Sequence, residues 1–366
     1  HENMLFFAIL GIIEAVVKLA IAFYIFYASY DKLIIYGMLM AVLSFIMLIL
    51  RQIYCHRYYT ECRINLQKYY NKLLFREMIG FAGWSFLGAT TSMLGTYGQG
   101  IVLNTFFGTI VNAAQGVAGQ VSGQLGAFAS TMLKALNPVI AKSEGAGNRS
   151  MMLKTSMIGS KISFFLLIIF YVPVMIEMPY IFKLWLKNIP EYAVIFCRLI
   201  LMRNLIEQFY ATLSNSIAAV GDIKKYQIYS SLFYILPLII SYFLFVYHYQ
   251  PFVLYLVFLF FTFVSFGITV YFSHELCDLP VKMYMQSVVF RCLASFIIVF
   301  LLSIIPLAFM DQGFLRLLLV TAISSMTYLI VGWLIGLTPE EQSKARDISK
   351  QLYSKLTFLL NKQRHL

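Results

Sequence analysis

Residues 81–147 read FAGWSFLGATTSMLGTYGQGIVLNTFFGTIVNAAQGVAGQVSGQLGAFASTMLKALNPVIAKSEGAG. The stretch is long enough for two membrane-spanning helices, yet it is rich in Gly, Gln, Asn, Ser and Thr. The segments on either side are apolar enough to lie in a bilayer. Because polar groups in hydrocarbon are costly, they usually face a bundle interior or a water-filled cavity.

At about 100° per residue, residues 112–138 place polar side chains on one face of a helix and large apolar ones on the opposite face. The polar face comprises Asn112, Gly116, Gly119, Gly123, Ser130, Lys134 and Asn137, widened by Gln120, Gln124 and Thr131. The apolar stripe, which we expect to face lipid, comprises Val117, Val121, Leu125, Phe128, Met132 and Leu136. The preceding segment repeats the pattern with Trp84, Gly88, Thr91, Ser92, Gly95 and Gln99 on one face.

Two interpretations of the polar face are open. Gly119 and Gly123 form a small-xxx-small motif, which allows two membrane helices to approach closely. Packing does not account for the large polar side chains of the same segment, which are Gln115, Gln120, Gln124 and Lys134. The second interpretation is that the face lines a cavity for a polar substrate.

The composition predicts an all-α polytopic membrane protein. Hydrophobic residues make up 60% of the chain, charged residues only 12%, and the mean hydropathy is +0.78, whereas soluble proteins are about 25% charged. Apolar runs of membrane-spanning length recur, and the short alternating segments of a β-barrel do not occur. The expected spans, about ten, lie at roughly 4–28, 33–50, 77–106, 109–142, 151–177, 191–219, 224–248, 252–273, 284–309 and 313–337.

The net charge of +12 does not indicate nucleic-acid binding, because the basic residues concentrate in particular loops. Residues 51–76, 142–154 and 221–225 and the tail hold most of the Lys and Arg, which places them on the cytoplasmic side. The aromatic segment 179–192 is expected at the outer interface. The tail opens with the capping box Thr338-Pro339-Glu340-Glu341 and continues as a basic amphipathic helix, expected to bind anionic lipid headgroups.

Ionisable residues inside the expected spans are candidates for function. Glu14 and Lys18 are four residues apart, so they are either an ion-coupling site or a mutually neutralising pair. Asn204, Glu207 and Asn215 share a face of the 191–219 span, with Arg203 at its edge. Arg203 and Glu207 can also pair with each other, which would leave them a structural role.

Motifs of several enzyme classes are absent from the sequence. It contains no GxxxxGK[ST] loop and no GxSxG elbow, and its five cysteines are scattered without a C-x-x-C pair. ATP hydrolysis, a disulfide framework and a zinc site are therefore not expected. We expect no enzymatic activity, no cofactor and no metal.

Four runs carry a family resemblance: KLLFREMIGFAGWSFLG, GIVLNTFFGTIVNAAQGVAGQVSG, ALNPVIAKSEGAG and FKLWLKNIPEYAVIFCRLIL. They resemble the Wzx-type polysaccharide flippases of the MATE-like multidrug/oligosaccharidyl-lipid/polysaccharide exporter superfamily. Members have two six-helix lobes and commonly two further helices. The resemblance implies that residues 1–50 are the last two helices of a truncated N-lobe and 51–76 the connector. Residues 77–273 are then the C-lobe, 284–337 the additional helices and 338–366 the amphipathic tail.

The resemblance implies a monomeric multi-pass transporter of the bacterial inner membrane, with both ends of this chain in the cytoplasm. It would flip an undecaprenyl-pyrophosphate-linked oligosaccharide to the outer leaflet by alternating access, for surface polysaccharide synthesis. The Asn, Gln and Thr side chains above, with Trp84, would bind sugar, and Lys134 and Arg203 the pyrophosphate. A cation-coupled multidrug exporter is the alternative, with Glu14, Lys18 or Glu207 as the coupling site. A membrane-integral glycan polymerase or ligase is the third possibility.

Overall fold

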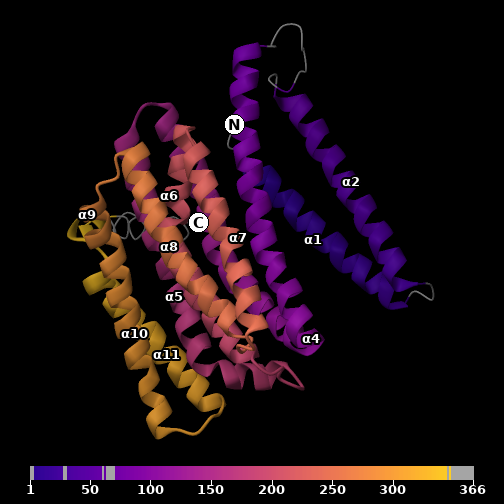
Figure 1. The fold of residues 1–366 in the computed structure, drawn as a ribbon, viewed down its shortest axis with the longest axis vertical. Helices are drawn as coiled ribbons and strands as arrows, with labels where there is room; N and C mark the ends of the chain where they lie inside the picture. Colours follow the sequence, from indigo (N-terminus) through magenta and orange to yellow (C-terminus); the bar gives the residue numbers. More distant parts are fainter. Residues whose placement is uncertain (1–3, 28–30, 60–61, 63–70, 344–345, 348–366) are drawn as a thin grey trace, which may run out of the picture. The chain divides into compact units, whose positions relative to one another are not determined.

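The computed structural model describes residues 4–27, 31–59, 62, 71–343 and 346–347, which are almost entirely helical and contain no strand (Figure 1). Eight helices within these ranges are long and apolar enough to cross a membrane. The expectation of an all-α chain with several membrane-length helices is confirmed. The chain divides into two compact units, His1–Phe75 and Arg76–Leu366.

The first unit is a pair of helices, α1 (Met4–Tyr27) and α2 (Lys32–Tyr58), which pack against each other. Asp31 caps α2, since its carboxylate accepts hydrogen bonds from the N–H groups of Leu33 at 3.0 Å and Ile34 at 3.4 Å. The small core between the helices consists of Leu10, Ile21, Leu43 and Met47. The predicted connector 51–76 is shorter than expected, because α2 continues to Tyr58 and the next helix begins at Lys72. Its basic residues at both ends extend the helices instead of interrupting them.

The second unit begins within α4 (Lys72–Gly145), which reverses direction at Gly108. Gly108 has φ 75° and ψ −172°, a conformation that side chains disfavour and glycine tolerates. A Cβ at Gly100 would lie 3.2 Å from Oε1 of Gln115, so the chain folds back on itself here. We call residues 72–107 the first half of α4 and residues 109–145 its second half. The break lies where the sequence predicts the turn between two spans.

The remaining helices complete the second unit (Figure 1). They are α5 (Arg149–Trp185), α6 (Ala193–Val220), α7 (Lys224–Val246), α8 (Val253–Cys277), α9 (Val281–Tyr284), η2 (Met285–Val289), α10 (Phe290–Phe309), α11 (Phe314–Val331) and η3 (Gly332–Gly336). α5 packs against α6, α10 and α11, and α8 packs against α6 and α7. α5 is the central element, since it fully buries Phe164, Tyr171 and Phe182.

The segment 179–192, expected at the outer interface, begins as a continuation of α5. α5 continues through Pro179 to Trp185, and Phe182 is fully buried in the core. A proline removes the hydrogen bond to the carbonyl four residues earlier, which here is that of Met175. Arg198 Nε donates to this carbonyl oxygen at 2.8 Å. Arg198 of α6 therefore satisfies the backbone at this break.

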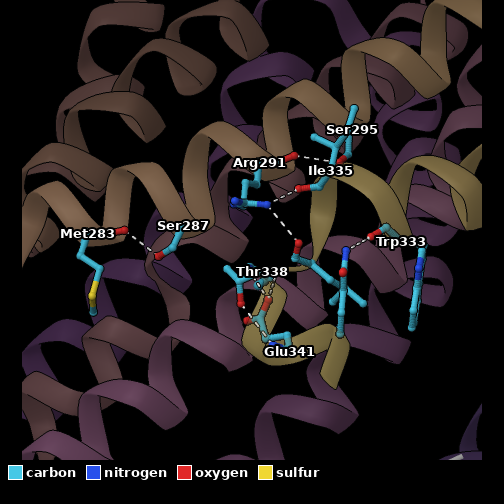
Figure 2. Close-up of polar contacts among 11 residues, drawn as sticks. Met283, Ser287, Arg291, Ser295, Trp333, Ile335, Thr338 and Glu341 are labelled. Carbon is cyan, nitrogen blue, oxygen red and sulfur yellow. Dashed lines mark hydrogen bonds and ion pairs between the residues drawn. The ribbon is translucent and has the colours of Figure 1, made fainter. Parts of the chain in front are cut away.

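Two π-helical turns, η2 and η3, lie at one end of the unit, and no sequence pattern predicted them. Arg291, the second residue of α10, donates through Nη1 to the carbonyls of Ile335 at 2.8 Å and Leu337 at 3.0 Å (Figure 2). The arginine thereby ties the end of η3 to the start of α10.

The predicted capping box is confirmed at the start of the tail. The N–H of Thr338 donates to Oε2 of Glu341 at 2.7 Å, and the N–H of Glu341 donates to Oγ1 of Thr338 at 3.4 Å. The rest of the predicted amphipathic helix, residues 344–345 and 348–366, lies outside the described residues.

Candidate functional site

The polar face of the second half of α4 lies on the outside of the second unit. The exposed members of this face are Gly116, Gly119, Gln120, Gly123, Gln124, Ser130, Thr131, Lys134 and Asn137, and Asn112 is half-buried. Among the described residues Gln120, Gln124 and Lys134 form no side-chain hydrogen bond or ion pair, and Thr131 bonds only to the carbonyl of Ala127 in its own helix. This membrane-length helix therefore presents several unsatisfied polar side chains together.

Most of the apolar stripe is not free to face lipid, so that expectation is wrong for four of its six residues, whereas Phe128 is exposed as expected. Val117, Val121, Leu125 and Leu136 pack against the core of the second unit, and Ala114 and Ala118 are fully buried there. An amphipathic pattern shows that a helix has two different faces, but not which one meets its neighbours. Here the helix uses its apolar face for packing and leaves its polar face free.

The packing interpretation of Gly119 and Gly123 is also wrong for the described residues. A Cβ at Gly116, Gly119 or Gly123 would meet nothing within 4 Å. These glycines therefore do not serve a close helix–helix contact in the structure.

Close packing occurs instead in the first half of α4, which was expected to share the cavity. A Cβ at Gly95 would lie 2.9 Å from the carbonyl oxygen of Tyr234 on α7. Thr91 is buried in the same contact, where its hydroxyl donates to Ser231 Oγ at 3.1 Å. Trp84 lies under the ammonium of Lys224, which is 5.5 Å from the ring centre. This face is a helix–helix interface, so Thr91 is removed from the cavity candidates.

Several predicted residues connect the second half of α4 to neighbouring helices. Asn215 donates through Nδ2 to Oδ1 of Asn137 at 2.6 Å, and Asn204 donates to Ser122 Oγ at 2.8 Å and to the hydroxyl of Tyr171 at 3.2 Å. Oε1 of Gln115 is buried without a hydrogen-bond partner among the described residues. The asparagines of α6 therefore fix the helix that carries the exposed polar face.

A lysine in a membrane-length helix can pair with an acidic residue such as Glu207, reach toward water at the inner end or face a cavity. Lys134 is exposed and has no ion-pair or hydrogen-bond partner in the described part of the chain, and Glu207 is paired elsewhere. Lys134 is therefore not paired with Glu207 or with another described residue, and the other two explanations stay open.

Arg203 and Glu207 form the pair that their spacing allowed. Arg203 Nε lies 3.1 Å from Glu207 Oε1, although the N–H is not aligned for a hydrogen bond. Both line a small, partly open cavity of about 40 Å³ together with Gln99, Tyr210 and Tyr234. Such a volume admits water, since one molecule needs about 10–15 Å³ by the same measure. Gln99 of α4 is thus brought beside the charged pair of α6, separately from the exposed polar face.

Glu14 and Lys18 lie in the first unit, where they form the predicted pair. Lys18 Nζ lies 2.8 Å from Glu14 Oε1, and an Arg51 Nη lies 3.5 Å from the other oxygen of the same carboxylate. The carboxylate is therefore neutralised by two cations, which accounts for its presence in an apolar helix.

Two of the charge pairs that were not predicted involve a buried residue of α5. Glu177 on α5 is completely buried, and its oxygens accept hydrogen bonds from Arg316 Nε at 2.8 Å and Nη2 at 3.0 Å. Lys161, also buried on α5, donates to Glu341 at 2.7 Å. A single acidic residue in VMIEMPYIF and a single basic residue in GFLRLLLV were visible as isolated charges in apolar spans. An isolated charge in hydrocarbon needs a partner, so each of these residues indicates an ion pair, although the sequence does not identify the partner.

The part of the chain that the structure describes contains no cluster of His, Cys, Asp and Glu that could hold a metal ion. Comparisons with models of known protein families, with curated proteins and with solved structures found no match to this chain.

Proposed function

We propose that this chain is part of a transporter that moves a lipid-linked oligosaccharide across the bacterial inner membrane to the outer leaflet. The observation that carries the proposal is the exposed polar face of the second half of α4. A helix of this length in an apolar chain normally satisfies its polar groups within the protein. Here Gln120, Gln124 and Lys134 lie free on the surface of the unit.

The chemistry of this face suits a glycan joined to a lipid by pyrophosphate. Amide side chains both donate and accept hydrogen bonds, as sugar hydroxyls require. Lys134 supplies a compact cation for a phosphate oxygen. The partner of the polar face is then a substrate that passes along it, with both ends of the chain in the cytoplasm and alternating access as the mechanism.

The test is glycan export in cells whose only copy of the transporter carries Lys134→Ala. A charge-assisted contact contributes about 1.5–3 kcal/mol, so we expect export to fall about tenfold or more. Lys134→Arg keeps the charge and should retain more activity. Lys187→Ala, an exposed lysine away from the polar face, is the matched control. Full export by a normally inserted Lys134→Ala protein would contradict the assignment of Lys134.

A cation-coupled exporter is the second candidate, and the cavity beside Arg203 and Glu207 favours it. Glu207 keeps 35% of its side chain accessible, so a proton or Na⁺ can reach a carboxylate that is held against a cation. Under this candidate, Glu207→Gln abolishes dye efflux driven by a proton or Na⁺ gradient while glycan export is unaffected. Under the first candidate, cells lacking the protein lose surface glycan and keep their dye efflux.

A further inference from the structure

A groove lies at the end of the second unit where α5 begins. It encloses about 920 Å³ between α5, the α9–η2 segment and residues 338–341. Its apolar lining includes Leu153, Met157 and Ile158 from α5, and Met283 and Val288 from the opposite side. The lining runs along α5 from Arg149 to Lys161, which is roughly 18 Å at 1.5 Å per residue. This length accommodates a polar headgroup and the first carbons of acyl chains.

The charges around the groove are equal in number. Arg149, Lys154 and Lys161 face Asp278, Glu340 and Glu341. Most of them neutralise one another. Arg149 bonds to Glu144 at 2.6 Å and to Asp278 at 3.1 Å, and Lys161 bonds to Glu341 at 2.7 Å.

After this pairing, one cation and one anion are left on the groove. Lys154 and Glu340 are both exposed, and neither has an ion-pair or hydrogen-bond partner in the described residues. They come from different walls, Lys154 from α5 and Glu340 from the turn after η3. A ligand with a negative and a positive group would complement both at once.

The wall that carries Glu340 is held in place by its neighbours. Thr338 and Glu341 form the capping box, Gln342 donates to the carbonyl of Trp333 at 2.6 Å, and Arg291 binds the carbonyl of Leu337 (Figure 2). The π-helical turn η2 supplies Ser287 and Val288 to the opposite wall. π-helical turns are rare and frequently occur at functional sites. The wall of the groove that carries Glu340 is therefore fixed by specific hydrogen bonds.

We propose that this groove binds a zwitterionic phospholipid whose headgroup carries a phosphate and a primary ammonium. Lys154 binds the phosphate, Glu340 binds the ammonium, and the apolar lining takes the upper acyl chains. The balance of charges favours this class over an anionic phospholipid, because Glu340 would repel a headgroup that carries only negative charge. The bound lipid links α5 to the segment that follows η3.

The test is native mass spectrometry of the full chain in detergent with three probes: phosphatidylethanolamine, phosphatidylglycerol and phosphatidylcholine. We expect phosphatidylethanolamine to bind most tightly. Lys154→Ala should weaken all three, because each has a phosphate, and phosphatidylethanolamine about tenfold. Glu340→Gln should weaken phosphatidylethanolamine in particular and abolish its advantage over phosphatidylglycerol.

The matched controls are Lys282→Ala and Glu191→Gln, which change exposed residues that do not line the groove. Both should bind the three lipids as the unchanged chain does, and monodisperse elution of every variant shows that it is folded. Equal binding of phosphatidylethanolamine and phosphatidylglycerol by the unchanged chain would overturn the proposal. So would tighter binding of the anionic lipid, or binding that neither groove variant alters.

Discussion

Glu177 and Arg316 illustrate the energetics of a charge pair at the scale of the residue. Glu177 is completely buried and Arg316 nearly so, with 12% of its side chain accessible. Removing one member of such a pair leaves the other charge buried, at a cost of about 3–5 kcal/mol. We therefore expect Glu177→Gln, which keeps the size and removes the charge, to lower the stability of the purified protein markedly. Thermal unfolding in detergent measures the effect.

The double variant Glu177→Met with Arg316→Met separates charge from packing. Replacing both members of a buried pair by apolar residues of similar volume is often neutral, so most of the lost stability should return. The outcome that contradicts this account is a double variant that is less stable than either single variant.

Lys134 and Glu177 show how far residue-level prediction reached. Both are isolated charges in membrane-length segments. Lys134 belongs to a polar face that is visible in the sequence, whereas Glu177 has only apolar sequence neighbours. The partner of Glu177 lies on α11, 139 residues away, and local periodicity carries no information about such pairing. The spacing of Arg203 and Glu207 was local, and that pair was anticipated.

At the scale of the element, the two halves of α4 use glycine differently. Gly95 faces the backbone of Tyr234, which cannot move out of the way like a side chain, whereas Gly119 and Gly123 face open space. Gly95→Ala should therefore destabilise the protein by about 1–3 kcal/mol through overpacking. Gly119→Ala should be neutral or stabilising by up to about 1 kcal/mol, because alanine favours helix more than glycine does.

Thermal unfolding of the two alanine variants in detergent compares them directly, with Gly123→Ala as a second control on the open face. Equal destabilisation at Gly95 and Gly119 would mean that the second half of α4 is also a packing surface. That result would also remove the main support for the proposed substrate face.

The capping box after η3 should make the stability of the folded protein depend on pH through Glu341. Burial acts to raise the pKa of Glu341, but the hydrogen bonds from Lys161 and Thr338 outweigh it and hold the pKa below its ordinary value of 4.5. A carboxylate whose pKa is lower in the folded than in the unfolded protein stabilises the folded state. This stabilisation is complete at pH values above the unfolded-state pKa, and it is lost as the pH falls through the folded-state pKa. The stabilisation should therefore be complete near neutral pH and decline below about pH 4.5.

Glu341→Gln isolates this contribution from the other carboxylates, which also titrate on acidification. The variant should be less stable than the unchanged chain at pH 7, and the difference should shrink as the pH falls below about 4.5. Melting temperatures measured in parallel across this range give the comparison. A difference that is independent of pH would show that the ion pair with Lys161 contributes nothing.

The helices themselves were more predictable than their orientation. Apolar runs of membrane length are a local signal, so the turn at Gly108 and the starts of most helices agree with expectation. The direction of each face depends on neighbours that are distant in sequence. This is why the apolar stripe through Val117 and Leu125 was assigned to lipid when it packs on the core. The end of the span expected at 177 was misplaced for the same reason, since α5 continues through Pro179 and Arg198 of another helix donates to the carbonyl of Met175.

At the scale of the whole molecule, the second unit joins two segments that were expected to be separate domains. Residues 77–273 and 284–337 both belong to it, and α10 and α11 pack directly on α5. The buried pair between Glu177 and Arg316 crosses this boundary. We therefore infer that α10 and α11 are integral to the unit.

The distribution of basic residues predicts the orientation of all these helices in the membrane. The segment 51–76, with Cys55 and Cys62, should face the cytoplasm, and the turn at 310–312 should face outward. A membrane-impermeant thiol reagent applied to intact cells should leave Cys55 and Cys62 unlabelled and react with them after permeabilisation. Cys197, Cys277 and Cys292 are buried and should stay unlabelled in both conditions while the protein remains folded.

Asp311→Cys supplies the positive control, because Asp311 is exposed in the turn between α10 and α11. This variant should be labelled in intact cells, in a chain whose Cys55 and Cys62 have been changed to serine. Labelling of Cys55 in intact cells, together with protection of the thiol introduced by Asp311→Cys, would reverse every helix. Lys154 and Glu340 would then meet the outer leaflet, and a substrate would pass along the exposed polar face of α4 in the opposite direction. Which of these two thiols is labelled in intact cells therefore decides from which side of the membrane a substrate first meets Lys134.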